Sequence, residues 1–143
     1  IQDQFYLSMV VSLGLISAMR PYIGMSLKIK WPNDILAEKD KLAGVLIENV
    51  LKGTNIHHSI IGIGLNVNQL EFPTEIGNVT SLKKLTGINF NIDELLFKVV
   101  NSIKKHVNYI EMEDFDSLKR YTWHNYIKLI HHQCLKILKA FFS

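Results

Sequence analysis

Residues 27–34, Leu-Lys-Ile-Lys-Trp-Pro-Asn-Asp, are the stretch of this sequence that decides its fold, together with Lys-Leu-Ala-Gly at 41–44. Apolar residues alternate with lysines over the first five positions, and a period of two predicts a half-buried β-strand. Pro32 cannot donate to a sheet ladder, so the strand should end there. Asn33 and Asp34 then favour a turn. The pattern fits an ordinary charged strand running into a turn, and it also fits a site where a cation, an amide and a carboxylate meet.

Two further strands are predicted directly after this turn. A short strand at 35–37 leads through a polar hairpin tip to a return strand at 41–51. Strict alternation puts Leu42 and Gly44 on one face of the return strand and Lys41 on the other. A β-bulge, or a strand that begins just after Lys41, would bring Lys41 and Gly44 to the same face.

The next strand, predicted at 57–68, carries an unusual pair of glycines. Apolar side chains on one face alternate with Gly62, Gly64 and Asn66 on the other. Glycine weakens a strand, so two on one face indicate that something approaches closely. The spacing leaves open whether this is a ligand or a neighbouring backbone or bulky core side chain. Asn66 is consistent with ligand binding and with capping a turn.

Helices are predicted on both sides of these strands. The end of a strand near Phe5 should pass into a helix at about 8–20, stopped by Pro21 and Gly24. A short helix is expected to end near Gly87. Asn91 to Glu94 read as a capping box that opens a longer amphipathic helix. The apolar stripe of that helix should point inward, at Leu95, Leu96, Val99, Val100, Ile103 and Val107.

Length and composition predict one soluble globular domain. The 143 residues are 48% hydrophobic and 20% charged. The net charge of +3 is spread as isolated lysines and pairs, so no nucleic-acid site is predicted. The single Cys134 excludes an internal disulfide and fits a reducing, cytoplasmic compartment. No basic region precedes the apolar run from Tyr6 to Met19, which is interrupted and short for a bilayer, so neither a signal peptide nor a membrane span is expected.

Three blocks, in this order, resemble the core of the biotin–protein ligases. They are Lys-Trp-Pro-Asn-Asp at 30–34, Lys-Leu-Ala-Gly at 41–44 and Gly-Ile-Gly-Leu-Asn at 62–66. The resemblance runs from about Tyr6 to Tyr126. It implies an α/β fold of the α+β type, with a mixed, largely antiparallel sheet flanked by helices, similar to the class II aminoacyl-tRNA synthetase-like core.

The resemblance also implies how the chain is organised. Residues 1–126 would be part of a biotin–protein ligase catalytic domain, truncated at the N-terminus. Residues 127–143 would be a divergent tail, either a helix or a stub of the family's small C-terminal barrel. A further helix is expected at about 114–126. The first residue is Ile1 rather than Met, which is expected of a fragment or a processed piece.

The activity implied by the resemblance has two steps. Biotin and ATP form biotinyl-5′-adenylate and pyrophosphate, and the biotinyl group then passes to a lysine on a carrier domain of a biotin-dependent carboxylase. Bringing a carboxylate onto an α-phosphate requires fixed cations and Mg²⁺ to neutralise the charge. The implied ligands are therefore ATP, Mg²⁺ and biotin, and a homodimer is a possible assembly.

The resemblance assigns roles residue by residue. Lys41 would be the catalytic cation that contacts both the biotin carboxylate and the α-phosphate. Asp34 is the candidate for a metal contact. The implied biotin contacts are Lys41, Gly44, Leu46, Gly62, Gly64 and Leu65. The implied nucleotide contacts are Lys30, Asn33, Asp34, Lys41 and Asn66.

One family hallmark has no counterpart in this sequence. The glycine-rich basic loop, roughly Gly-Arg-Gly-x-x-Gly-Arg-x-Trp, is not present, and Arg20 and Arg120 do not match it. Two alternatives therefore stand beside a ligase. One is a non-catalytic fragment or interaction module that dimerises through an exposed sheet edge. The other is a lipoate–protein ligase, which shares the fold and the adenylation step.

Overall fold

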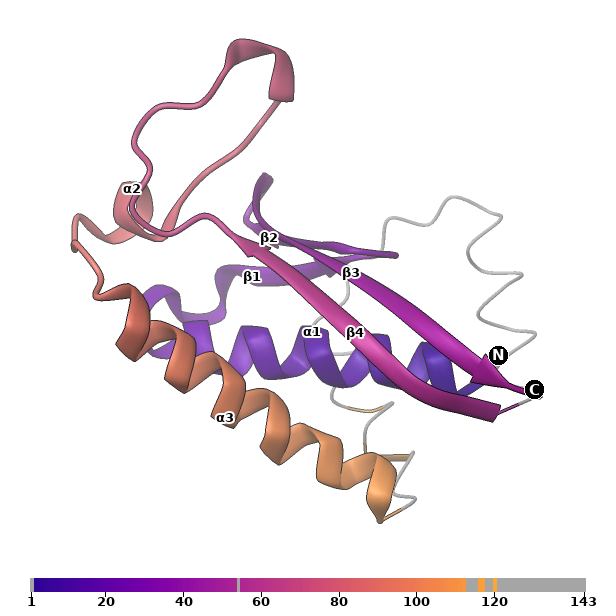
Figure 1. The fold of residues 1–143 in the computed structure, drawn as a ribbon. Coiled ribbons are helices and arrows are strands. Elements are labelled where there is room, and N and C mark those ends of the chain that lie inside the picture. Colours follow the sequence, from indigo (N-terminus) through magenta and orange to yellow (C-terminus); the bar gives the residue numbers. More distant parts are fainter. Residues whose placement is uncertain (1, 54, 113–115, 118–119, 121–143) are drawn as a thin grey trace.

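The computed structural model describes residues 2–53, 55–112, 116–117 and 120 (Figure 1). Residues 2–111 contain two long helices, one short helix and four strands, with 3₁₀ turns at Gly24–Ser26 and Thr74–Ile76. The helices and strands are α1 (Gln2–Ile23), β1 (Leu27–Lys30), β2 (Asp34–Ala37), β3 (Asp40–Lys52), β4 (Asn55–Leu65), α2 (Leu82–Thr86) and α3 (Ile92–Glu111).

The four strands form one sheet in the order β1-β2-β3-β4, and each neighbouring pair is antiparallel. Both long helices lie on the same side of this sheet (Figure 1). Alternation in β1 explains the layering, because Leu27 and Ile29 are buried whereas Lys28 and Lys30 are exposed. The α+β prediction, with a largely antiparallel sheet, is confirmed.

Helix α1 is longer than the sequence predicts. It begins at Gln2, so the strand expected near Phe5 is wrong, and it continues through Pro21 to Ile23. Proline this close to the end of a helix removes one hydrogen bond from the last turns, which the buried apolar residues of α1 outweigh. Gly24, with φ +75°, ends the helix in the left-handed conformation that glycine adopts readily.

The apolar character of α1 comes from its place in the core. By length and composition alone, Phe5–Ile23 is long and apolar enough to cross a membrane, so the expectation of a run too short for a bilayer is wrong. Half of the stretch is buried inside the fold. Met9, Val11 and Ile16 are almost inaccessible in the same core cluster as the inward residues of the sheet. This burial is what a core helix requires.

Helices α1 and α3 meet in a close seam. A Cβ atom added at Gly14 would lie 2.7 Å from the Cα atom of Ile103, closer than real Cβ atoms approach backbone. Two polar contacts flank this point: the Ser17 Oγ and His106 Nε2 atoms are 3.3 Å apart, and Lys98 Nζ donates to the Tyr22 hydroxyl at 2.6 Å. The absence of a side chain at Gly14 therefore lets the two helices cross at this distance.

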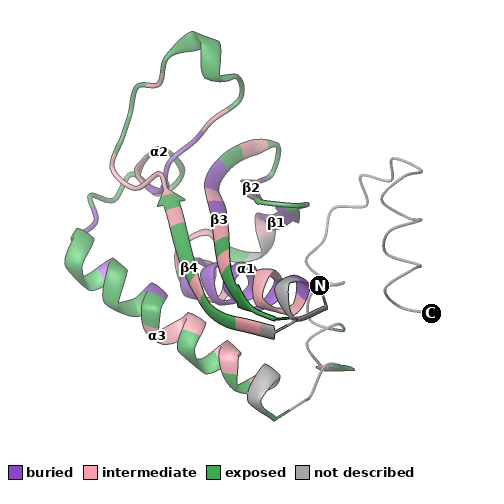
Figure 2. Ribbon diagram, turned by 45° about the vertical axis from the view of Figure 1, so that its right-hand side comes forward, coloured by how far each residue is buried: buried purple, intermediate pink, exposed green. Residues whose placement is uncertain are grey.

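The inward stripe predicted for α3 is only partly buried. Leu95 and Val99 are 4% and 5% exposed, whereas Leu96 and Val100 are 58% and 40% exposed. The prediction was wrong for this second pair because α3 packs against α1 and leaves a space between itself and β4. Figure 2 shows the resulting contrast between a mainly buried α1 and a largely exposed α3.

The short elements match the sequence closely. Ser81 caps α2 by accepting a hydrogen bond from the Lys84 N–H, and Gly87 ends that helix in the left-handed conformation. Asn91 Oδ1 accepts from the N–H groups of Asp93 and Glu94 at the start of α3.

Of the helix predicted at 114–126, residues 116, 117 and 120 are described and helical. The predicted tail at 127–143 lies outside the described residues.

Candidate functional site

A β-bulge in β3 decides where Lys41 points. Ile35 pairs with Ala43 and Leu36 pairs with Lys41, so Leu42 is one extra residue between two paired positions. Leu42 and Ala43 are consequently both buried, at 0% and 1% exposure. Lys41 therefore lies on the same face as Gly44, as the bulge hypothesis required, and the placing of Leu42 on that face by strict alternation is wrong.

Lys41 forms an ion pair on this open face of the sheet. Its Nζ atom lies 2.7 Å from Oδ1 of Asp34, with the two side chains 45% and 25% exposed. A pair this accessible contributes about 0–1 kcal/mol to stability. Lys41 can therefore exchange Asp34 for the oxygen of an anionic ligand at small cost.

Around this pair lies an open pocket of about 480 Å³. It sits on the face of the sheet away from α1 and α3, between the turn that precedes β2 and the paired strands β3 and β4. Seven of the ten residues assigned from the sequence line it: Asn33, Asp34, Lys41, Gly44, Leu46, Gly62 and Gly64. Val45 and Ile63 complete the lining and were missed, because alternation places their side chains on the helix side.

The three glycines of the pocket are not required by the packing of the protein. A Cβ atom at Gly44 would lie 3.5 Å from Lys41 Cε, one at Gly62 would lie 3.7 Å from the Leu46 carbonyl oxygen, and one at Gly64 would lie 4.0 Å from the Gly44 carbonyl oxygen. These are ordinary contact distances, and none of the three has a positive φ. Neither a neighbouring backbone nor a core side chain fills the space, so the glycines keep the floor of the pocket low.

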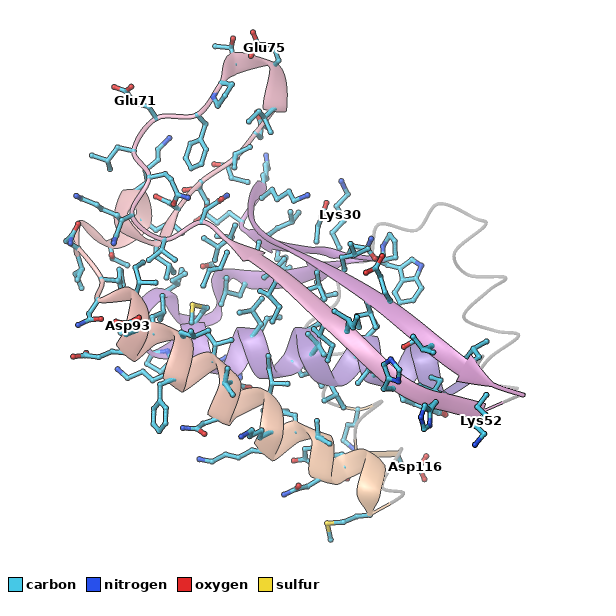
Figure 3. All side chains as sticks on the ribbon, in the orientation of Figure 1. Lys30, Lys52, Glu71, Glu75, Asp93 and Asp116 are labelled. Atoms are coloured by element: carbon cyan, nitrogen blue, oxygen red, sulfur yellow. The ribbon has the colours of Figure 1, made fainter. Side chains whose placement is uncertain are left out.

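The backbone of Lys41 is held by a segment from outside the sheet. The Lys41 N–H donates to the Asn78 carbonyl and the Thr80 N–H donates to the Lys41 carbonyl, both at 3.0 Å. This short parallel bridge follows the loop that carries Glu71 and Glu75 and projects beyond the sheet (Figure 3). The sequence does not predict this bridge, because a long-range contact leaves no local pattern.

The residues that directly follow β4 are hydrogen-bonded to β3 near Lys41 and to the start of α2. The Asn66 N–H donates to the carbonyl of Leu42, the bulge residue, and the Asn66 carbonyl accepts from the Leu82 N–H, both at 3.0 Å. The Lys83 N–H donates to the Val67 carbonyl at 2.9 Å. The backbone of Asn66 is therefore fixed beside the bulge, although Asn66 does not line the pocket.

Two more assigned residues lie outside the pocket lining. Lys30 pairs across the sheet with Asp34 and is exposed, so it extends the open face beside the ion pair (Figure 3). Leu65 points to the other side of the sheet, where it packs against the core cluster. Any contact between Leu65 and a ligand in the pocket must use its backbone.

The pocket offers one carboxylate to a metal ion. Among the described residues, no group of three or more His, Cys, Asp or Glu side chains is placed to hold a metal. Mg²⁺ commonly binds one or two carboxylates together with substrate phosphates and water. Asp34 therefore fits a Mg²⁺ ion that arrives with a nucleotide, and it does not by itself make a metal site.

Comparison with known sequences gives a match that includes the sequence blocks at 30–34, 41–44 and 62–66. The model of the biotin/lipoate A/B protein ligase family matches residues 1–66, which include all ten assigned residues. The bifunctional ligase/repressor BirA of Bacillus subtilis is 36% identical over 84 residues, which are 57% of this chain and 26% of that protein. The biotin–[acetyl-CoA-carboxylase] ligase of Paracoccus denitrificans is 40% identical over 63 residues, 43% of this chain and 26% of that protein.

Solved structures of biotin protein ligases are similar to this chain over a longer part of its length. The apo structure of biotin protein ligase from Aquifex aeolicus has a TM-score of 0.77 and 29% identity, covering 90% of this chain and 57% of that one. Its complex with biotin and ATP has a TM-score of 0.74 and covers 87% and 52%. The chain thus spans about a quarter of the length of its curated relatives and about half of the solved ligase.

Proposed function

We propose that this chain is a member of the biotin/lipoate protein ligase family, whose model matches residues 1–66, and that its open pocket binds biotin and ATP and supports their joining into biotinyl-5′-adenylate. The observation that carries this proposal is the empty floor over Gly44, Gly62 and Gly64, next to the cation of Lys41. A flat ring system fits over a floor without side chains, and its carboxylate would then meet Lys41.

In the first step, an oxygen of the biotin carboxylate attacks the α-phosphorus of ATP. A carbon-bound oxygen forms a new bond to phosphorus, the bond from that phosphorus to the bridging oxygen breaks, and pyrophosphate leaves. Both reactants are anions, so the cation of Lys41 would hold them together and stabilise the charge that develops on the phosphoryl oxygens. Lys41 is thus the proposed catalytic residue.

In the second step, the amine of a carrier-domain lysine attacks the acyl carbon of the adenylate. An amide bond forms, the bond from the acyl carbon to the phosphate oxygen breaks, and AMP leaves. Named relatives are biotin–[acetyl-CoA-carboxylase] ligases, so we propose as acceptor the carrier domain of a biotin-dependent carboxylase in the cytoplasm.

The remaining assignments divide the pocket into two ends. Leu46, 60% exposed, and the backbone of Leu65 would flank the biotin ring with the glycines. Lys30, Asn33, Asp34 and Asn66 would serve the nucleotide. Asp34 would hold Mg²⁺ that enters with ATP and neutralises phosphate charge. Residues 1–126 would form this part of the catalytic domain, and 127–143 would follow it as a separate tail.

The test is calorimetric titration of the 143-residue chain with biotin, with and without ATP and Mg²⁺. Lys41→Met keeps a side chain of similar length without the charge, and Lys39→Met is the matched control because Lys39 is exposed at the tip of the same hairpin. We expect Lys41→Met to weaken biotin binding by about tenfold or more, since a charged hydrogen-bonding partner contributes about 1.5–3 kcal/mol. Lys39→Met should change it by less than about twofold.

Two results would contradict the proposal. Equal binding by both variants would remove Lys41 from the site. Displacement of bound biotin by an equal concentration of lipoate would favour a lipoate–protein ligase instead.

A further inference from the structure

A group of lysines lies on the open face of the sheet, on the β1 side of the proposed ligand pocket. Lys28 pairs across the sheet with Leu36, which pairs in turn with Lys41. Lys30 pairs with Asp34. Residues directly opposite each other on neighbouring strands point to the same face. Lys28, Lys30 and Lys41, the lysine group, therefore lie around Leu36 on the open face.

The burial of Leu36 agrees with this arrangement. Leu36 is 7% exposed, yet it does not belong to the core cluster, which includes its chain neighbours Ile35 and Ala37. Its side chain lies on the other face of the sheet, between Lys28 and Lys41. Lysine side chains can cover an apolar surface with their methylene groups while their ammonium groups stay in water. Leu36 thus gives the lysine group an apolar floor.

The charges of the lysine group are not balanced by carboxylates. The ammonium group of Lys41 is paired with Asp34 at 2.7 Å. Lys28 and Lys30 are exposed, and neither forms an ion pair among the described residues. Residues two positions apart on a strand lie about 7 Å apart and point to the same side, so the fields of their charges add. This edge of the pocket therefore attracts anions that carry several negative charges.

The geometry of the proposed reaction directs its leaving group toward the same edge. The glycine floor extends from Lys41 toward β4, because Gly44 pairs with Gly64 of that strand. A biotin molecule over this floor would bring its carboxylate to the α-phosphorus from the β4 side. In phosphoryl transfer the attacking and leaving oxygens are roughly in line across the phosphorus. The pyrophosphate would therefore leave on the opposite side, toward β2 and β1.

We propose that Lys28 and Lys30 form a pyrophosphate subsite, in which Lys28 is a further substrate-binding residue. This inference rests on the proposed function. When the bond from the α-phosphorus to the bridging oxygen breaks, that oxygen keeps the electron pair, and negative charge develops on the departing pyrophosphate. The ammonium groups of Lys28 and Lys30 would bind this charge through charge-assisted hydrogen bonds. Lys41 remains with the biotin carboxylate and the α-phosphate.

The spacing of the two lysines favours a diphosphate over a single small anion. Pyrophosphate offers one anionic phosphate group to each of the two cations, whereas sulfate offers a single anionic centre. Binding to both lysines at once adds the two contacts without a second loss of freedom for the ligand. Preference for pyrophosphate over sulfate therefore separates a subsite at Lys28 and Lys30 from a surface that merely carries positive charge.

The test is calorimetric titration of the 143-residue chain with inorganic pyrophosphate, without biotin, ATP or Mg²⁺. Lys28→Glu reverses one charge of the subsite. Lys52→Glu is the matched control, because it changes the net charge equally at an exposed site at the end of β3, far from Lys30 (Figure 3). We expect Lys28→Glu to weaken pyrophosphate binding by about tenfold or more and Lys52→Glu by less than about twofold. Sulfate should bind the unaltered chain at least about fivefold more weakly than pyrophosphate.

A difference of this size between the two folded variants would support the subsite. No binding of pyrophosphate, equal affinity in the two variants, or equal affinity of the unaltered chain for pyrophosphate and sulfate would overturn it. If circular dichroism shows Lys28→Glu to be unfolded, Lys28→Met and Lys52→Met take their place, with an expected difference of about threefold. Biotin titration of Lys41→Met tests the proposed function separately. A chain that binds biotin through Lys41 but not pyrophosphate through Lys28 would lack this subsite and keep the proposed function.

Discussion

Helix α3 borders two apolar regions that differ in how completely they are filled. On one side it meets α1 in a seam so close that Gly14 has no room for a side chain. On its other side it faces β4 across a groove that water reaches. Helix α3 is thus closely packed against α1, whereas a groove separates it from β4. The contrast teaches that hydrophobic residues at helical spacing predict burial only where a partner element is present.

The largest expected effect comes from breaking the closed seam. Gly14→Val would drive a branched side chain into the backbone of Ile103, which cannot move without separating the two helices. We expect a loss of about 3 kcal/mol in the free energy of unfolding, at the upper end for overpacked sites. Urea unfolding followed by circular dichroism measures it. A variant as stable as the original chain would show that the seam is looser than described.

A smaller difference is expected between two neighbours on α3. Leu95 is 4% exposed and Leu96 is 58% exposed, so the first is buried in the core and the second is accessible to water. Leu95→Ala should lower the free energy of unfolding by about 2–3 kcal/mol, because it removes buried methyl groups. Leu96→Ala should lower it by less than about 0.5 kcal/mol. Thermal unfolding of the pair measures both, and equal losses would mean that the groove is filled in solution.

A small effect on stability is also expected at a glycine of the ligand pocket. Gly62→Val is the same substitution as in the seam, but a Cβ atom at Gly62 meets nothing closer than 3.7 Å. Valine favours strands, so the free energy of unfolding should change by less than about 1 kcal/mol. Biotin binding should be lost, because the side chain occupies the floor of the pocket. Unchanged affinity in calorimetry would argue that this floor holds no ligand.

The sequence alone predicts the strands and much of the site for physical reasons that are local. Alternation set the extent of β1 and β3, and the Asn91 side chain marked the start of α3. The bulge at Leu42 was anticipated only because Lys41 and Gly44 were expected to share a ligand. The bridge from Asn78 and Thr80 to Lys41 was missed, because it joins residues nearly forty positions apart.

The errors at the helices share one cause. The early start of α1 and the exposure of Leu96 both depend on what packs against them, and local pattern does not contain that information. Pro21 was read as a helix stop because proline is costly in helix interiors, whereas the buried face of α1 carries the helix past it. Tertiary packing overrides local preference at each of these positions.

The bulge in β3 decides which face of the sheet Lys41 lies on. Lys41 and Gly44 are three positions apart, and a regular strand would place two such residues on opposite faces. Losing the bulge without changing the number of residues would restore strict alternation and turn the Lys41 ammonium toward the buried helix side, among apolar side chains. Deleting Leu42, or adding one residue beside it, would make the spacing even, so that a regular strand keeps Lys41 on the open face but at a different distance along the strand from Gly44. Adding two at the hairpin tip, by contrast, would lengthen the turn and leave the parity unchanged. The tip at residues 38 and 39 is therefore free to vary in length, while the spacing from Lys41 to Gly44 is not.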